Sequence, residues 1–230
     1  MTQSAVPPTL LLVQGAWHHP DAWLPLRGEL FLRGLRTAVV YLPSAGVDPT
    51  GSMHDDARAI VSALSDIGGP VVIMAHSYGG IPVTQASAAA HNVSRLIYLS
   101  AYLPDVDGSM FTLHGAPDPE DTTGLFPAIG SPRISLYADL SDEESAAAES
   151  RLIDQTALSF AGRVTAAGWK HIPTTYIISD QDQAIPPAMQ LEMAGAAGAD
   201  VVHLNSSHSA FLSMPGELAD LVVKTIGETS

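Results

Sequence analysis

Short apolar runs recur along this chain, and they limit the folds open to it more than any other feature. Each run is four or five residues long and rich in branched side chains, as is typical of strands buried on both faces of a parallel sheet. The runs span residues 10–13, 38–42, 71–75, 96–99, 175–178 and 201–204. Helical periodicity fills most of the intervals, for example Ala57, Ile60, Val61 and Leu64 on one face after a predicted Ser52 cap. This alternation predicts an α/β fold with a doubly wound, mostly parallel sheet of about six strands.

The alternation breaks over residues 105–170, where glycine and proline dominate at first. A long irregular segment inside a compact fold is usually functional, so we expect residues 1–230 to form one domain in which 105–170 is a cap over the substrate. A disordered linker is the alternative. Ser141 followed by Glu144 forms a capping box, which predicts a helix with an apolar side. That side would carry Leu152, Ile153, Ala157 and Phe160.

Composition narrows the classes of function. The chain has 230 residues, 46% of them hydrophobic, enough for a substantial core. Its net charge of −14 disfavours binding to nucleic acid or to an anionic membrane surface. The absence of cysteine excludes a thiol nucleophile. Residues 1–8 lack the basic segment of a secretory signal and no apolar run approaches the roughly 20 residues of a membrane span, so we expect a cytoplasmic protein.

Ser77 follows the third apolar run directly, in the segment Ala75-His76-Ser77-Tyr78-Gly79. A hydroxyl attacks an acyl carbon when it is held clear of the backbone beside a base, and a sharp strand-to-helix turn between small residues holds it so. Ala75 replaces the first glycine of the usual G-x-S-x-G pattern but is also small. The segment predicts a nucleophile elbow, with an ordinary helix N-cap serine as the alternative.

A serine nucleophile needs an imidazole base and a carboxylate that orients it. His208 lies four residues after the last predicted strand, and parallel strands deliver their carboxyl ends to one edge of the sheet, so His208 and Ser77 would share that edge. The acid should follow the preceding strand, where Asp182 is the preferred candidate. One alternative is Asp180, although it could instead bind backbone amides in the turn. Another is Asp105, which follows an earlier strand.

A tetrahedral intermediate also needs amide donors for its oxyanion. The N–H of Tyr78 directly follows the nucleophile. The loop after the first strand contains Gly15, which lets the backbone curl, and we expect the N–H of Ala16 to be the second donor. A phosphate cradle would compete for such a turn, but the chain has no G-x-G-x-x-G and no Walker lysine. The sequence implies no cofactor and no metal.

With these residues assigned, the chain resembles the α/β-hydrolase superfamily along essentially its whole length. It is most similar to the branch of plant methylesterases and hydroxynitrile lyases with their bacterial serine esterase relatives. The matching segments are residues 11–18, 76–80, 182–186 and 207–212. The resemblance implies the same roles: Ser77 as nucleophile, His208 as base, Asp182 as acid, and Ala16 and Tyr78 as oxyanion amides.

Three departures from relatives refine the expected chemistry. The family usually has histidine where this chain has Gln14, which can hydrogen-bond within the loop but cannot titrate, so activity should survive. Hydroxynitrile lyases of this branch resemble the esterases but add a lysine after the catalytic histidine and a hydroxyl residue in the oxyanion loop, where this chain has Ser209 and Gly15. Haloalkane dehalogenases and epoxide hydrolases resemble this fold too, but they have aspartate at the elbow where this chain has Ser77. Hydrolysis by a serine nucleophile is therefore favoured over lyase chemistry.

We expect a serine hydrolase that cleaves a small carboxylic ester or lactone through an acyl-enzyme. The substrate pocket should be mainly apolar and lined by Trp17, His18, Tyr102, Leu103, Phe111, Leu125, Phe126, Ile185 and Phe211. The same triad could act on a C–C bond or an amide, or transfer an acyl group in a biosynthetic pathway. A ligand-binding protein without activity is the rival from another class. A homodimer packed through the cap or the sheet edges is compatible with the sequence.

Overall fold

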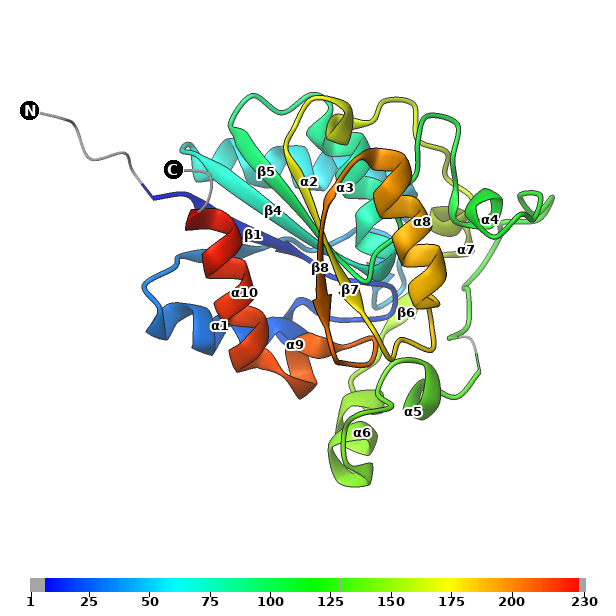
Figure 1. Ribbon diagram of the computed structural model, residues 1–230. Helices are drawn as coiled ribbons and strands as arrows, with labels where there is room; N and C mark the ends of the chain where they lie inside the picture. Colours follow the sequence, from blue (N-terminus) through cyan, green and yellow to red (C-terminus); the bar gives the residue numbers. More distant parts are fainter. Residues whose placement is uncertain (1–6, 129, 228–230) are drawn as a thin grey trace, which may run out of the picture.

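A six-stranded parallel sheet runs through the centre of the molecule in the computed structural model, which describes residues 7–128 and 130–227 (Figure 1). The strands are β1 (Thr9–Val13), β2 (Thr37–Val39), β4 (Val71–His76), β5 (Val93–Leu99), β7 (Thr174–Ser179) and β8 (Asp200–Leu204). Their order is β2-β1-β4-β5-β7-β8, and every neighbouring pair is parallel. The doubly wound sheet predicted from the apolar runs is confirmed.

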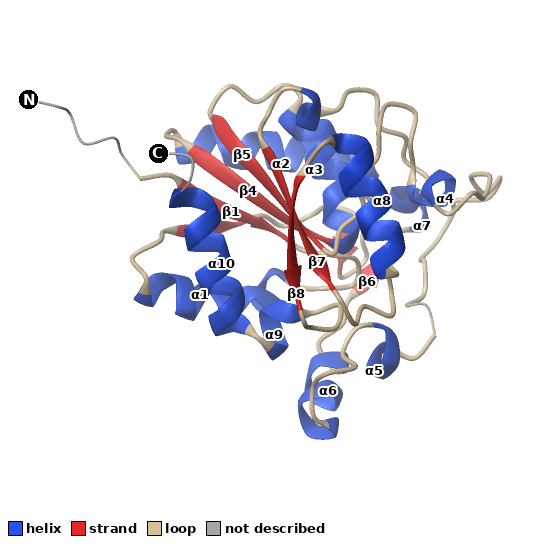
Figure 2. Cartoon of the chain, in the orientation of Figure 1, coloured by secondary structure: helices blue, strands red, loops and turns tan. Residues whose placement is uncertain are grey.

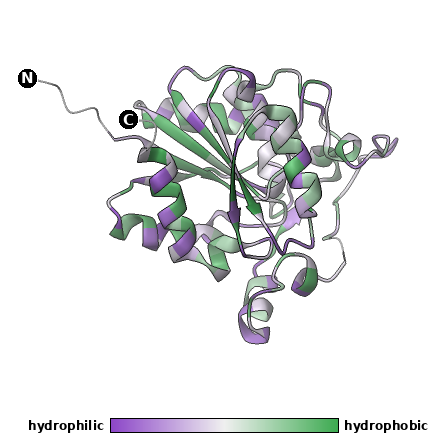
Figure 3. Ribbon diagram, in the orientation of Figure 1, coloured by the Kyte–Doolittle hydropathy of each residue, from purple (hydrophilic) through white to green (hydrophobic). Residues whose placement is uncertain are grey.

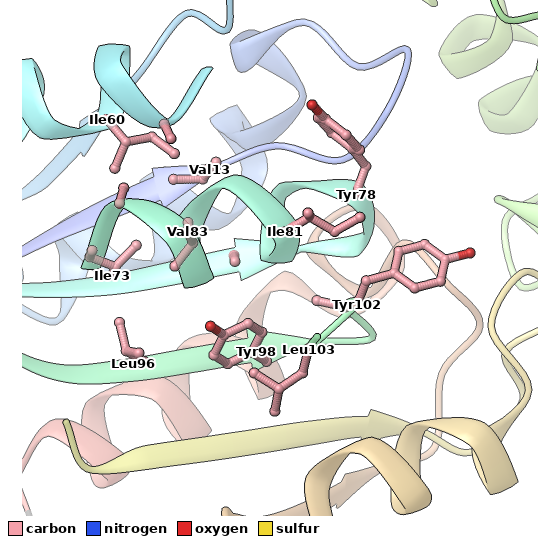
Figure 4. Packing of buried hydrophobic residues seen from close by; sticks show 14 of the residues in the cluster. Val13, Ile60, Ile73, Tyr78, Ile81, Val83, Leu96, Tyr98, Tyr102 and Leu103 are labelled. Carbon is pink, nitrogen blue, oxygen red and sulfur yellow. The ribbon is translucent and has the colours of Figure 1, made fainter. Parts of the chain in front are cut away.

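Helices cover both faces of the sheet (Figure 2). One face is covered by α2 (Met53–Ile67), α3 (Gly80–Ser87) and α8 (Pro187–Ala197), and the other by α1 (Leu24–Leu32), α9 (Ala210–Ser213) and α10 (Pro215–Gly227). Strand residues alternate between the two core clusters: Leu11 packs toward α2, whereas Leu10 and Leu12 pack toward α1. The inner strands β1, β4 and β7 are accordingly buried on both faces, whereas the edge strands β2 and β8 are partly exposed (Figure 3). Figure 4 shows Val13, Ile73 and Leu96 of three strands in one cluster with Ile60 of α2.

The sheet reverses its winding at β1, which lies between β2 and β4. Loops that follow β1 and β4 therefore emerge side by side at the carboxyl edge of the sheet, where α/β proteins bind their ligands. The loop after β1 leads into η1 (Pro20–Trp23), and the turn after β4 is η2 (Ser77–Gly79). The fold thus brings the predicted elbow next to the predicted oxyanion loop.

Between β5 and β7 the chain forms short elements away from the sheet. They are α4 (Met110–Leu113), α5 (Pro132–Ser135), α6 (Asp142–Glu149), β6 (Asp154–Gln155), α7 (Ala157–Phe160) and η3 (Gly168–Lys170). β6 pairs antiparallel with β3 (Ala45–Gly46), which ties this segment to the loop after β2. Leu136, Tyr137 and Leu140 form a small apolar cluster of their own between α5 and α6.

Two expected boundaries were wrong. The capping box at Ser141 does begin a helix, as the one at Ser52 does, but the helix ends at Glu149 rather than continuing through Phe160. Beyond it, the N–H of Ile153 donates to the carbonyl of Trp17 and β6 joins β3, so pairing with distant backbone overrides the helical pattern. β2 ends at Val39 rather than at residue 42. It is an edge strand that pairs with β1 alone, and β1 ends at Val13, so the residues that follow have no strand to pair with.

Within the two described ranges, no helix combines the length and the apolar character needed to cross a membrane. Residues 1–6, which carry most of the segment expected not to be a secretory signal, lie outside the described residues.

Candidate active site

Ser77 occupies a sharp turn at the end of β4, with a positive φ of 52° that a side-chain-bearing residue rarely adopts. The glycines that follow allow the turn to pack. A Cβ on Gly79 would lie 2.5 Å from the backbone oxygen of Gln14, and one on Gly80 would lie 2.0 Å from that of Tyr102. The turn is therefore strained and closely packed from both sides, as a nucleophile elbow requires.

His208 and Asp182 contact each other at the same edge of the sheet. His208 follows β8, Asp182 follows β7, and 2.8 Å separates Nδ1 of His208 from Oδ2 of Asp182. Both side chains are buried. Because a carboxylate can only accept, the Nδ1 atom of His208 carries the hydrogen, which leaves Nε2 free to accept a proton.

Asp182 is held by further donors that fix its orientation. Its Oδ1 accepts hydrogen bonds from the N–H groups of Ala184 (2.7 Å) and Ile185 (3.0 Å), and its Oδ2 accepts one from Nε2 of Gln190 (2.9 Å). Gln190 lies in α8, and its own Oε1 accepts from the N–H of Ser179. Sequence reasoning missed Gln190, because a glutamine within a helix gives no signal until the helix is placed beside the loop.

The two alternative carboxylates lie elsewhere. Asp180 contacts Nδ1 of His203 at 2.7 Å near the surface, and Asp105 contacts Nζ of Lys170 at 2.5 Å. Of the three candidate acids, Asp182 is the one in contact with His208.

His76 joins the elbow to the loop that carries His208. Its Nε2–H donates to the backbone carbonyl of His208 at 3.0 Å, and the two rings lie 4.6 Å apart. Burial, together with the neighbouring imidazoles, lowers the pKa of His76 well below its usual value, so the ring is neutral. The residue next to Ser77 therefore holds the His208 loop in place without adding a charge.

The loop after β1 packs tightly against the elbow. A Cβ on Gly15 would lie 2.7 Å from Nδ1 of His76 and 2.8 Å from Cβ of Ser77. The backbone oxygen of Ala16 accepts a hydrogen bond from Nδ1 of His18 (2.8 Å), and Nε2 of His18 accepts one from Oη of Tyr137 (2.9 Å). Burial lowers the pKa of His18 to about 4, so the ring keeps this neutral tautomer.

Gln14, in the loop after β1, is buried. Among the described residues its buried Oε1 has no partner, so this atom does not make the loop contact predicted for it.

The residues predicted to line the pocket fall into three groups. Trp17 stacks on Phe126 and Phe160, and Phe111 meets Phe126 edge-on, which forms an aromatic cluster; Trp17, Leu125 and Phe126 also line a cavity of about 500 Å³. His18 lines a second cavity of about 550 Å³ between α1 and α6. The remaining four are buried, and Phe211 packs on Trp23 on the α1 side of the sheet. Those four are Tyr102, Leu103, Ile185 and Phe211.

A family model described as "Alpha/beta hydrolase family" matches residues 10–221. The chain belongs to the alpha/beta hydrolase family. This α/β-hydrolase is 30% identical to "Alpha/beta hydrolase nvfD" from Aspergillus novofumigatus, with 95% of each chain covered. It is 24% identical to "Methylesterase 7" from Arabidopsis thaliana, over 93% of this chain and 94% of the relative.

Solved structures show the same architecture. The α/β-hydrolase superimposes on a methylesterase protein, MES16, from Arabidopsis with a TM-score of 0.81 and 23% identity, covering 96% of this chain and 99% of the other. An extracellular alpha/beta-hydrolase from a Paenibacillus species gives a TM-score of 0.81 at 18% identity, covering 95% and 98%. The expected resemblance to the methylesterase branch is confirmed, and the protein is an α/β-hydrolase-fold enzyme.

Proposed function

We propose that this enzyme hydrolyses a small carboxylic ester or lactone with Ser77 as nucleophile, His208 as base and Asp182 as the acid that orients it. The observation that carries the proposal is the buried contact between His208 and Asp182 beside the strained turn at Ser77. An imidazole with its Nδ1–H on a carboxylate and its Nε2 available to accept a proton is the arrangement needed to activate a hydroxyl.

In the proposed reaction, Oγ of Ser77 bonds to the acyl carbon while its proton passes to Nε2 of His208. The negative charge that develops on the carbonyl oxygen is stabilised by the N–H groups of Ala16 and Tyr78. Collapse of the intermediate breaks the ester C–O bond, and the leaving oxygen takes the proton from His208. A water molecule then repeats the sequence on the acyl-enzyme, releasing the acid and restoring Ser77.

The aromatic cluster supports a substrate with an aromatic or alicyclic group. Trp17 comes from the loop after β1, and Phe111, Phe126 and Phe160 come from residues 105–170. We propose that this segment covers the acyl carbon and excludes water from it. The relatives named methylesterases support an ester as the bond cleaved.

The nucleophile is tested by covalent labelling. A fluorophosphonate should label the wild-type protein, and the label should vanish in Ser77→Ala while hydrolysis of p-nitrophenyl esters is lost. Labelling that persists in Ser77→Ala would remove Ser77 from the mechanism. Labelling of the wild type without turnover of any ester would point to C–C, amide or acyl-transfer chemistry by the same serine.

The acid is tested by a matched pair of substitutions on one loop. Asp182→Asn should lower kcat for p-nitrophenyl acetate by roughly 10⁴-fold, because the amide can favour the wrong imidazole tautomer. Asp180→Asn changes the same side chain two residues away and should leave kcat within about two-fold, because Asp180 contacts His203 rather than His208. Equal losses in the two variants would contradict the assignment of Asp182.

A further inference from the structure

A buried carboxylate that the proposed chemistry does not use lies behind the elbow. Asp56 of α2 is 0% exposed and accepts hydrogen bonds from the N–H of Ser44 (2.9 Å), from Oγ of Ser44 (2.5 Å) and from Oη of Tyr78 (2.6 Å). None of these donors carries a positive charge. Burial therefore raises the pKa of Asp56 to about 6, although all three donors act to lower it.

On one side the carboxylate holds Tyr78, whose N–H is one of the two proposed oxyanion donors. The Tyr78 ring extends from the elbow and packs against Phe160 with the ring centres 5.2 Å apart (Figure 4 shows the ring beyond the end of β4). Burial raises the pKa of the Tyr78 hydroxyl well above 10, so it stays protonated and donates to Asp56. With the ring fixed at its far end, the Tyr78 backbone has little freedom to rotate.

On the other side the carboxylate connects to the loop after β1. Oγ of Ser44 donates to Asp56 and accepts a hydrogen bond from Nε2 of Gln155 at 2.6 Å. Oε1 of Gln155 accepts one from the N–H of Trp17 at 3.4 Å. Trp17 directly follows Ala16 and has a positive φ of 60°, so this contact holds a strained residue next to the second proposed donor.

The chain of contacts also includes residues 105–170. Gln155 lies in β6, which pairs with Ala45 and Gly46 directly after Ser44, and Nε2 of Gln155 donates as well to Oγ of Ser159 (2.9 Å). Ser44, Gln155 and Ser159 are all 0% exposed, so water does not substitute for these partners. The network is complete when β6 is packed on β3.

We propose that Asp56 is a positioning residue for the oxyanion hole. Through Tyr78 on one side and through Ser44, Gln155 and Trp17 on the other, it holds the N–H groups of Tyr78 and Ala16 at a fixed separation. The role in catalysis rests on the proposed function, because it concerns the reaction of Ser77. Donors that are displaced stabilise the transition state less while binding the uncharged ester almost as well, so kcat should fall with little change in KM.

Kinetics on p-nitrophenyl acetate test this role with substitutions that keep the size of the side chain. Tyr78→Phe and Asp56→Asn should each lower kcat by about 10- to 100-fold with KM within about two-fold. The double variant should lose no more kcat than the less active of the two single variants, because both side chains act through one contact. Tyr98→Phe is the matched control, because the Tyr98 hydroxyl is also buried but forms its hydrogen bond with Thr84, at 2.8 Å, and not with the loops that carry Ala16 and Tyr78. This variant should retain kcat. A kcat in Tyr78→Phe equal to that in Tyr98→Phe would overturn the proposal.

The physical link is tested without turnover by the backbone amide resonances of the protein. In Asp56→Asn the ¹H–¹⁵N signals of Tyr78, Ala16 and Trp17 should all shift, and in Tyr98→Phe they should stay at their wild-type positions. If the signals of Ala16 and Trp17 do not move in Asp56→Asn, the proposal that Asp56 positions both amide donors is overturned. If the wild type neither hydrolyses esters nor takes the fluorophosphonate label, the proposed function fails, and these signals still decide whether Asp56 joins the two loops.

Discussion

At the scale of the residue, the turn at Ser77 depends on a glycine that has no Cβ atom. Gly79 stands in the position of the second glycine of the G-x-S-x-G pattern, and its missing Cβ leaves room for the backbone oxygen of Gln14. The loop that carries Ala16 can therefore approach Ser77 closely. Ala75, at the position of the first glycine, is buried within β4 and its methyl group packs in the core cluster beneath α2. The turn therefore requires a small residue two positions before the serine and a glycine two positions after it.

Gly79→Ala should therefore destabilise the protein by about 1–3 kcal/mol and lower esterase activity, because backbone atoms 2.5 Å away cannot move aside cheaply. Gly28→Ala is the control: Gly28 lies inside α1 with open space around its Cβ position, and alanine there should stabilise by about 0.5–1 kcal/mol. Urea unfolding measures both. An unchanged stability in Gly79→Ala would mean that the Gln14 loop moves more freely than this packing allows.

At the scale of the element, α2 places Asp56 and is fixed by its first turn. Ser52 accepts a hydrogen bond from the N–H of Asp55, and the Asp55 carboxylate accepts one from the N–H of Ser52 at 2.8 Å. The hydrogen bonds to Ser52 lower the pKa of Asp55, so the box remains formed at neutral pH. This reciprocal cap begins the helix at Met53 and thereby sets which helical face carries Asp56 toward the core.

Ser52→Ala should cost about 1 kcal/mol of the free energy of unfolding, because it leaves the N–H of Asp55 without its capping acceptor. Ser65→Ala lies near the other end of the same helix, where the exposed hydroxyl donates to the carbonyl of Val61, and it should change stability by less than about 0.5 kcal/mol. The urea midpoints of the two variants compare them directly. A larger loss in Ser65→Ala would show that α2 is not fixed by its cap.

At the scale of the whole molecule, buried titratable groups make opposite contributions to stability in acid. The pKa of His18 is about 4 in the folded chain against an ordinary 6.5, so the unfolded chain binds a proton first and stability falls as the pH drops through this range. His76 acts in the same direction. The pKa of Asp56 is about 6 against an ordinary 3.8, so the folded chain binds a proton first and stability rises as the pH drops from 6 to about 4.

Asp56→Asn should therefore make the protein more sensitive to acid. Relative to the wild type, the variant should lose roughly 2 kcal/mol more of its unfolding free energy between pH 6.5 and pH 4, because it lacks the compensating protonation. Urea unfolding at several pH values in this range measures the difference, and Asp66→Asn, an exposed carboxylate on the same helix, serves as the control. Parallel pH curves for wild type and Asp56→Asn would contradict the raised pKa of Asp56.

The sequence by itself determined the sheet, the turn at Ser77 and the loops that carry Asp182 and His208. Each of these depends on a few neighbouring residues. The signals are an apolar run, small residues around a serine, and polar residues after a strand. The tertiary structure decided that Asp182, rather than Asp180 or Asp105, contacts His208, and that the helix after Ser141 stops at Glu149. It also brought Asp56, Gln155 and Gln190 to the site from distant positions, since a buried hydrogen bond depends on which elements pack together and leaves no periodic trace in the chain.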